Sequence, residues 1–413
     1  MKIAVVGSGI AGLGAAWLLS RRHEVVLFES ETRLGGHTHT HRVELGGRHY
    51  AVDTGFIVYN PLNYPLFTRL LDELGVASQP TTMGFSVQDA RNGLEYNATS
   101  LDALFCQRRN LLSPRFLKMV REILRFYRES PALLQLEGAG PTLGEYLGEQ
   151  RYSPLFVDDH LVPMACALWS SPSDTILRFP AKHLVRFMAN HQMLDAGTRP
   201  AWRVLQGGSS SYLQALQRDW NVQVRTGARI SHVRREDEQV LVGTDAGEER
   251  FDHVVLACHS DQALALLADP SQAEREVLGA LRYQRNQTVL HTDARLLPKR
   301  RKAWAAWNAY VPATPGADCT VSYCMNLLQA LDAPEPLVVT LNRTQDIDPA
   351  RIISRMDYAH PVQDHASVAA QARRGEVNGL ARTWYAGAYW GYGFHEDGLR
   401  SGVDVARALG VEW

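Results

Sequence analysis

Short apolar runs and helical patterns alternate at the beginning of the chain. Residues 2–6 form a β-branched strand pattern, residues 13–19 a helical pattern, and residues 24–28 a second strand pattern. Residues 254–257 are another unbroken apolar run, which is typical of a strand covered on both faces. These patterns indicate a parallel sheet with helices packed against it.

The remaining patterns divide into helical and strand-rich parts. Leucines recur at helical spacing between Pro61 and Leu74, and residues 101–195 are mostly helical with breaks at proline and glycine. Strand-like alternation covers residues 84–98 and most of 284–341. The shorter predicted elements are a strand near 221–225, a hairpin of 228–234 with 239–244, a strand that runs into a glycine turn over 383–387, and helices over 212–218 and 398–409.

Composition excludes several classes of protein. The 413 residues are 45% hydrophobic and carry 43 basic and 44 acidic side chains, so the chain is neither disordered nor a strongly basic partner of nucleic acid. Its five cysteines are scattered and form no C-x-x-C, which argues against a disulfide framework or a zinc site. No apolar run is long enough to cross a membrane, and no leader pattern precedes the first strand, so we expect a cytoplasmic protein.

The first loop has the spacing of a dinucleotide site. Gly7 permits a tight turn, Gly9 lets the backbone approach a pyrophosphate, and Gly12 lets the following helix pack close to the sheet. The N–H groups of Ile10 and Ala11 then face the phosphates at the helix N-terminus. Glu29, at the end of the second strand, can accept hydrogen bonds from ribose hydroxyls and disfavours the 2′-phosphate of NADP.

The next segment favours FAD over NAD. Arg33 is followed by the pair Gly35-Gly36, and residues 36–58 then run as a glycine-punctuated, strand-like excursion where an NAD domain would continue into a helix. This arrangement resembles the second fingerprint of two-dinucleotide-binding-domain flavoproteins, in which the glycine pair lets the chain follow an extended cofactor. The resemblance extends to Thr54-Gly55-Phe56.

One cofactor domain therefore combines three distant pieces of chain. The predicted fold class is α/β, with a Rossmann-like FAD-binding domain and an inserted α+β substrate domain. The FAD-binding domain comprises residues 1–60, 200–268 and 376–413. The substrate domain comprises 61–199, which is mainly helical, and 269–375, which is mainly antiparallel sheet.

Four motifs spread along the chain resemble the flavin-containing amine oxidase superfamily. They are the first glycine loop with Glu29, the Arg33-to-Gly36 segment, the strand 252–257, and Ala386-Gly387 followed by Gly398. The resemblance implies that the last segment runs beside the flavin ring, that the final helix points its N-terminus at the ring's C2 carbonyl, and that the backbone of Val233 holds the adenine. The implied FAD contacts are Gly7, Gly9, Ile10, Ala11, Gly12, Glu29, Ser30, Arg33, Gly35, Gly36, His37, Thr54, Gly55, Phe56, Val233, Gly387, His395 and Gly398.

A narrower resemblance points to lipid chemistry. Residues 52–60 and 389–398 resemble a bacterial branch of predicted NAD/FAD-binding proteins whose genes often lie beside cyclopropane-fatty-acid-synthase-like methyltransferases. This association implies a hydrophobic substrate such as a modified fatty acyl chain, and a lipid methyltransferase as a partner. The chain departs from the oxidase pattern at His37, where an arginine is usual, and at Ala388, where an acid is usual. It also lacks the segment that attaches flavin covalently, so non-covalent FAD is expected.

The candidates for chemistry lie in the turn before the last helix. His395 and Tyr392 are predicted to face the flavin, where a histidine can relay a proton; the alternative role of His395 is to cap the helix. Tyr389, Trp390, Tyr392 and Phe394 either wall an apolar channel or pack around the flavin. Lys182 is a weaker candidate for the water-holding lysine of some superfamily oxidases.

Two further patterns have alternative interpretations. His37, His39 and His41 have a spacing that can bind a metal, but this segment is expected to follow the flavin, so no metal site is predicted. Residues 115–128 form a basic amphipathic helix, with Phe116, Leu117, Val120, Ile123, Leu124 and Tyr127 on one face. Such a helix either covers a core or contacts an anionic membrane, the inner membrane in this case.

The sequence thus favours an FAD-dependent oxidoreductase that passes hydride from a hydrophobic substrate to flavin N5, as a dehydrogenase, desaturase or oxidase. Three alternatives stay open: an amine oxidase, a flavin-dependent double-bond isomerase, and a non-catalytic flavoprotein partner of a lipid methyltransferase.

Overall fold

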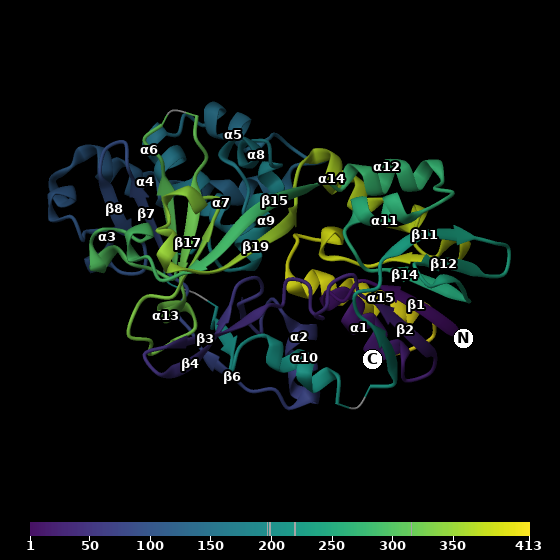
Figure 1. The fold of residues 1–413 in the computed structure, drawn as a ribbon. Helices are drawn as coiled ribbons and strands as arrows, with labels where there is room; N and C mark the ends of the chain where they lie inside the picture. The colour runs from purple at the N-terminus through teal and green to yellow at the C-terminus, as the bar shows by residue number, and fades with distance from the viewer. Residues whose placement is uncertain (196, 198–199, 219, 315) are drawn as a thin grey trace.

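The expected parallel sheet is present. The computed structural model describes residues 1–413 except 196, 198, 199, 219 and 315. Five strands lie in the order β10-β2-β1-β14-β20, and every neighbouring pair is parallel. The strands are β1 (Lys2–Val6), β2 (Glu24–Phe28), β10 (Val222–Arg225), β14 (His253–Leu256) and β20 (Thr383–Tyr385). Three distant pieces of chain therefore build one sheet, which lies on the right in Figure 1.

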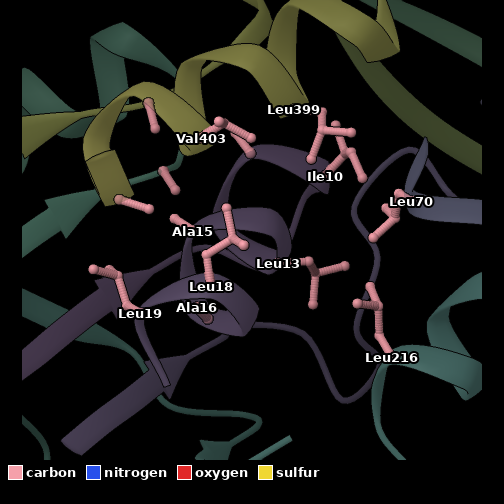
Figure 2. Close-up of a cluster of buried hydrophobic side chains, with 14 of the residues drawn as sticks. Ile10, Leu13, Ala15, Ala16, Leu18, Leu19, Leu70, Leu216, Leu399 and Val403 are labelled. Carbon is pink, nitrogen blue, oxygen red and sulfur yellow. The ribbon is translucent and has the colours of Figure 1, made fainter. Parts of the chain in front are cut away.

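One face of this sheet is covered by helices from both ends of the chain. Helices α1 (Ile10–Leu19) and α15 (His395–Ala408) pack together, and Figure 2 shows their apolar side chains interleaved. Close approach depends on Gly402, because a Cβ there would lie 2.3 Å from the carbonyl oxygen of Ala11. Helices α2 (Pro65–Leu74) and α10 (Ser210–Leu216) add Phe67, Leu70 and Leu216 to the same core.

The opposite face carries a small antiparallel sheet and three helices. The predicted hairpin is present as β11 (Ile230–Arg235) and β12 (Val240–Thr244), and a third strand, β13 (Gly247–Phe251), pairs with β12. The helices are α11 (Ser260–Leu266), α12 (Gln272–Ala280) and α14 (His365–Ala372). Sequence-based boundaries assign α2, α12 and α14 to the substrate domain, but their apolar side chains enter the two cores of the cofactor domain.

The substrate domain is built on a seven-stranded sheet of order β19-β15-β18-β17-β16-β7-β8. Strands from the first insertion join those of the second, because β7 pairs in parallel with β16. The pair β15 and β19 is the longest and reaches back toward the cofactor domain in Figure 1. The strands are β7 (Phe85–Asp89), β8 (Leu94–Asn97), β15 (Tyr283–His291), β16 (Trp307–Val311), β17 (Thr320–Cys324), β18 (Val338–Leu341) and β19 (Ile352–Pro361).

The predicted helical region is confirmed and packs against this sheet. Its helices are α3 (Leu101–Leu104), α4 (Pro114–Glu129), α5 (Leu143–Glu149), α6 (Pro154–Phe156), α7 (Val162–Trp169), α8 (Ser173–Leu177) and α9 (Ala181–Asn190), and α13 (Met325–Leu328) follows β17. The predicted apolar face of α4 is partly wrong. Phe116 is buried in the core, but Leu117 and Leu124 are exposed, because the buried arc is centred on Met119 and Phe126.

Two small sheets connect the domains. The glycine-punctuated segment forms an antiparallel ribbon of β3 (Thr40–Leu45) and β4 (Arg48–Asp53). Strands β5 (Val58–Tyr59), β9 (Arg203–Leu205) and β6 (Ser78–Pro80) form a second sheet. Within the described residues, no helix has the length and apolar character needed to cross a bilayer.

Candidate active site

The first glycine loop has the geometry of a phosphate cradle. Gly7 has a φ of 102°, and its N–H donates to the carbonyl of Phe28. A Cβ on Gly12 would lie 1.9 Å from the carbonyl oxygen of Gly7, so only glycine fits there. A Cβ on Gly9, the N-cap of α1, would meet nothing within 4 Å. The first turn of α1, with Ile10 and Ala11, has N–H groups without partners inside the helix, which suits a phosphate.

Glu29 is held at the end of β2 by its neighbours. One carboxylate oxygen accepts from the N–H and hydroxyl of Ser8, and the other accepts from the N–H of Glu31 and, at 3.3 Å, from the hydroxyl of Ser30. These bonds fix the carboxylate beside the glycine loop, where it can meet a ribose.

The second glycine pair lies directly against the first loop. The N–H of Gly35 donates to the carbonyl oxygen of Ser8 at 3.1 Å, and a Cβ on Gly36 would lie 3.2 Å from the Cα of Gly9. Both glycines have positive φ. Arg33 extends alongside, bonded to the carbonyl of Thr38 and paired with Glu31.

The segment after β4 lies beside the glycine pair. The N–H of Phe56 donates to the carbonyl of His37 at 2.8 Å, and a Cβ on Gly55 would lie 2.1 Å from that same oxygen. Thr54 contacts the next element of the site, since its hydroxyl lies 2.8 Å from the hydroxyl of Tyr358.

The C-terminal segment meets the N-terminal loop, as the sequence predicts. A Cβ on Gly398 would lie 2.7 Å from a methyl group of Ile10, and the N–H of Gly387 donates to the hydroxyl of Ser401. The last helix begins at His395, three residues before the predicted start. Its turn is fixed by Asp397, whose carboxylate accepts from the N–H groups of Tyr392 and Phe394.

His395 is enclosed by aromatic and hydroxyl side chains. Its ring stacks on Phe56 with a centroid separation of 3.6 Å, and its Nε2 lies 3.0 Å from the hydroxyl of Tyr212. That hydroxyl lies 2.7 Å from the hydroxyl of Thr38. Burial lowers the pKa of His395 to about 3, so the imidazole is neutral at pH 7.

Sequence analysis missed the side chains of β15 and β19 that face this site. Tyr358 lies 2.9 Å from Nδ1 of His39, and the rings of Tyr358 and His360 lie 5.0 and 5.2 Å from that of His37. Asn286 bonds His360 at 2.8 Å. The only available signal was the two-residue spacing of Tyr358 and His360, which places them on one face of a strand without saying what that face meets.

The imidazoles around His37 are neutral. Burial lowers the pKa of His37 well below its usual value, and the nearby His360 and His259 act in the same direction. Burial also lowers the pKa of His39 and of His360 to about 4. Nε2 of His37 is buried without a hydrogen-bond partner. Within the described residues, no group of three or more His, Cys, Asp or Glu side chains has the arrangement of a metal site.

Carboxylates near the site are satisfied by donors of the protein. Asp53 accepts from Thr40, Ser209 and the amide of Gln329. Glu396 accepts from the N–H groups that begin α2, and Asp397 holds the turn described above. Burial raises the pKa of both Asp53 and Asp397 to about 6.

The four aromatic residues of the turn face different surroundings. Tyr392 lies against His183 of α9 with ring centroids 4.4 Å apart, and Phe394 stacks on Phe187 at 5.0 Å. Tyr389 and Trp390 instead belong to the core around β14 and β20. The predicted aromatic wall is therefore divided between the substrate domain and the cofactor domain.

Two other candidates lie apart from the turn. Nζ of Lys182 is bonded to the carbonyl groups of Leu136 and Gly138 in an exposed position, so the structure does not support a water-holding role. Val233 is fully buried in β11, and its carbonyl already accepts from the N–H of Ala268.

These residues fit an extended FAD. The open space at Gly9, the fixed carboxylate of Glu29 and the unpartnered Nε2 of His37 lie on segments that contact each other at the glycine loop. Gly7, Gly9, Ile10, Ala11, Gly12, Gly35 and Gly36 would hold the phosphates, Glu29 the ribose, and Gly387, His395 and Gly398 the flavin end.

Comparison with known proteins agrees with this arrangement. The family model for flavin containing amine oxidoreductase matches residues 10–292. A Mycobacterium tuberculosis protein named as a flavin-containing monoamine oxidase, AofH, is 25% identical over 284 residues, which are 65% of this chain and 59% of that protein. The chain thus spans about three fifths of that relative's length. Tryptophan 2-monooxygenase of Pseudomonas savastanoi is 24% identical over 400 residues, covering 86% of this chain and 70% of that protein.

Solved structures share the fold along the whole chain. Cyclohexylamine oxidase of Brevibacterium oxydans (16% identity) and a conjugated linoleic acid (CLA)-producing fatty acid isomerase of P. acnes (17% identity) each have a TM-score of 0.69 and cover 99% of this chain and 98% of theirs. The glycine loops, the fixed acid, the family match and the shared fold together show that the chain belongs to the flavin-containing amine oxidoreductase family and has FAD as its cofactor.

Proposed function

We propose that the protein is an FAD-dependent oxidoreductase that removes hydride from an uncharged, apolar substrate, and that a modified fatty acyl chain is the substrate class. One observation carries the substrate class. The carboxylates near the flavin end, Asp53, Glu396 and Asp397, already accept hydrogen bonds from the protein. An ammonium substrate is favoured by a carboxylate that is free to pair with it, whereas an alkyl chain needs no such partner.

The surroundings of the turn also favour an apolar ligand. Phe187, Tyr392 and Phe394 form one aromatic group beside α9, and the imidazoles of His37, His360 and His395 are neutral. A neutral, aromatic surrounding excludes water and does not repel an alkyl chain. The fold is also that of the CLA-producing fatty acid isomerase of P. acnes, which its name assigns to a fatty acid.

The residues of this chain have defined roles in the proposed reaction. Bound FAD supplies the hydride acceptor. The N-terminus of α15, aimed at the flavin end, stabilises negative charge that develops there. His395 is bonded through Tyr212 to Thr38, so these three side chains form a hydrogen-bonded path along which a proton of the substrate can leave.

The test is anaerobic reduction of the FAD-loaded protein. Fatty acyl substrates with and without a methyl branch are mixed with the yellow protein, and a panel of primary amines is run in parallel. We expect acyl chains to bleach the oxidised flavin band and to lose two hydrogen atoms by mass spectrometry. Amines should leave the band unchanged.

The alternatives predict different results. Bleaching by amines alone would establish an amine oxidase. An acyl product of unchanged mass with a shifted double bond, and no bleaching, would establish an isomerase. A yellow protein that changes neither substrate would match a non-catalytic partner of a lipid methyltransferase. Each of these results would overturn the proposal.

A variant pair tests the role of His395. His395→Gln should slow bleaching by about tenfold or more while FAD stays bound. The matched control is His232→Gln, since His232 is a half-exposed residue of β11 and bonds Ser231 and Glu248 rather than residues of the turn. Equal bleaching rates in both variants would remove His395 from the mechanism.

A further inference from the structure

Exposed leucines gather at one end of the substrate domain. Leu101 is 76% exposed and Leu112 is 87% exposed, and Leu111, Leu117 and Leu124 are also exposed. These five are nearly half of the eleven exposed large apolar side chains in the described part of the chain, yet they lie within 24 residues. We call them the leucine tip. In Figure 1 the elements that carry them lie at the left edge, far from the cofactor sheet.

The short helix over 108–112 and α4 carry four of the five leucines and contact each other, and α3 directly precedes them in the chain. Leu101 begins α3, Leu111 and Leu112 end a 3-10 helix (Arg108–Leu112), and α4 follows directly. The rings of Phe105 and Phe116, from the same stretch of chain, lie 5.7 Å apart. The core of this region is made by other residues, including Phe116, Met119 and Phe126, so folding does not need the exposed leucines.

Basic side chains are concentrated in the stretch of sequence that carries the leucine tip. Residues 101–129 carry seven basic and three acidic side chains, although the whole chain has a net charge of −1. A second basic group, residues 299–302, lies against the same end, because Lys302 pairs with Asp102 at 3.1 Å and Arg300 with Glu95 of β8 at 2.9 Å. The exposed cations nearest in sequence to the leucines are Arg108, Arg109, Arg115, Lys118 and Arg121.

We propose that the leucine tip docks the protein onto an anionic lipid bilayer. Leucines inserted below the headgroups, with arginine and lysine at headgroup level, match the polarity of that boundary. A second copy of the chain fits less well, since a twofold contact through this surface would place the two basic rims against each other. The proposal differs from a contact made by one amphipathic helix, because Phe116, Met119 and Phe126 of α4 are buried in the core and the exposed leucines come from three elements.

The test is flotation of the FAD-loaded full chain with vesicles. Vesicles of phosphatidylcholine alone are compared with vesicles that contain about one third phosphatidylglycerol, at low and at physiological salt. We expect the protein to float with the anionic vesicles only, and less of it as salt rises. This result is independent of the proposed reaction, because it requires no turnover.

Two double variants within the surface, with one control elsewhere on the molecule, test whether the leucine tip makes the contact. Leu111→Asp with Leu112→Asp should lower the bound fraction by about tenfold or more. The matched control is Leu62→Asp with Leu380→Asp, whose side chains are 58% and 57% exposed elsewhere on the molecule, and these should float like the wild type. Arg115→Gln with Arg121→Gln should weaken binding to anionic vesicles and reduce its dependence on salt. Thermal unfolding and the flavin spectrum show whether each variant folds.

Three results would overturn the proposal. The first is that the wild type does not float with anionic vesicles. The second is that the leucine pair and its control lose the same fraction of vesicle-bound protein. The third is that light scattering shows a dimer which the leucine substitutions disrupt, while the protein does not float. The last result would assign the leucine tip to self-association.

Discussion

The contact between α1 and α15 gives a quantitative prediction for Gly402→Ala. The new Cβ would lie 2.3 Å from the carbonyl oxygen of Ala11 and 3.1 Å from the nitrogen of Ala15, where ordinary contacts begin at 3.4 Å. Both neighbours are backbone atoms of a helix, so relief requires the helices to separate by roughly 1 Å. Such overpacking costs about 1–3 kcal/mol, and the helix preference of alanine over glycine returns about 0.5–1 kcal/mol.

The expected result is a lower unfolding temperature and weaker FAD binding. A net loss of about 1–2 kcal/mol corresponds to roughly 2–8 °C for a domain of this size. FAD binding weakens because Ala11 lies in the turn of α1 that faces the phosphates. Differential scanning fluorimetry of the FAD-saturated protein and fluorescence titration of FAD measure the two effects.

Two other glycines complete the series. In Gly148→Ala of α5 the Cβ meets nothing within 4 Å, so stability should stay constant or rise slightly. The effect of Gly14→Ala on stability should fall between the two, because its neighbour at 2.6 Å is a side-chain atom, Cδ1 of Leu399, rather than backbone. If Gly402→Ala unfolds at the wild-type temperature and binds FAD as tightly, the argument from close helix approach is refuted.

Three further predictions concern titration and buried pairs. Burial lowers the pKa of His291 from 6.5 to about 4, so between these pH values the unfolded chain binds more protons than the folded chain. The free energy of unfolding should therefore fall as the pH drops from 6.5 to about 4, and His291→Gln should reduce that slope in urea titrations. An unchanged slope would contradict the lowered pKa of His291. The carboxylate of Glu274 accepts hydrogen bonds from Arg235 and from the hydroxyl of Tyr385. Glu274→Gln should therefore lower the free energy of unfolding, measured by urea denaturation, by about 2–3 kcal/mol. A loss below about 0.5 kcal/mol would show that the Glu274–Arg235 pair contributes little. Asp397→Ala removes the acceptor of the Tyr392 and Phe394 N–H groups and should raise the dissociation constant for FAD about tenfold. The control is Asp404→Ala in the same helix, which removes a pair with Arg374 and should leave that constant unchanged. Equal dissociation constants in the two variants would show that the turn keeps its shape without Asp397.

The glycine positions of the cofactor site could be predicted because the local backbone conformation requires glycine there. Gly7, Gly12 and Gly36 occupy positions where a side chain would collide with backbone or where φ is positive, so their spacing shows directly in the sequence. Glu29 was identifiable because a carboxylate at the end of the second strand has few other roles. The predicted start of the last helix was three residues late, because the bonds from Asp397 to the preceding turn do not show as a helical pattern.

The other half of the site depended on strand pairing. His360 and Asn286 are 74 residues apart and become neighbours only through the register of β15 with β19. Likewise, Tyr392 and Phe394 pack against α9, whereas Tyr389 and Trp390 enter the core around β14 and β20. This division depends on which elements pack against the turn. A period of two or 3.6 residues gives the faces of an element but not the element that covers them.

The sequence alone determined the nucleotide loop, the assembly of one sheet from distant pieces, and the class of cofactor, because these depend on short spacings and on apolar runs. Only the tertiary structure decided which side chains of β15 and β19 lie beside His37 and His39, that the nearby carboxylates are already bonded, and that Leu117 and Leu124 of α4 are exposed. Those features depend on contacts between elements far apart in the chain, and such contacts leave no local pattern.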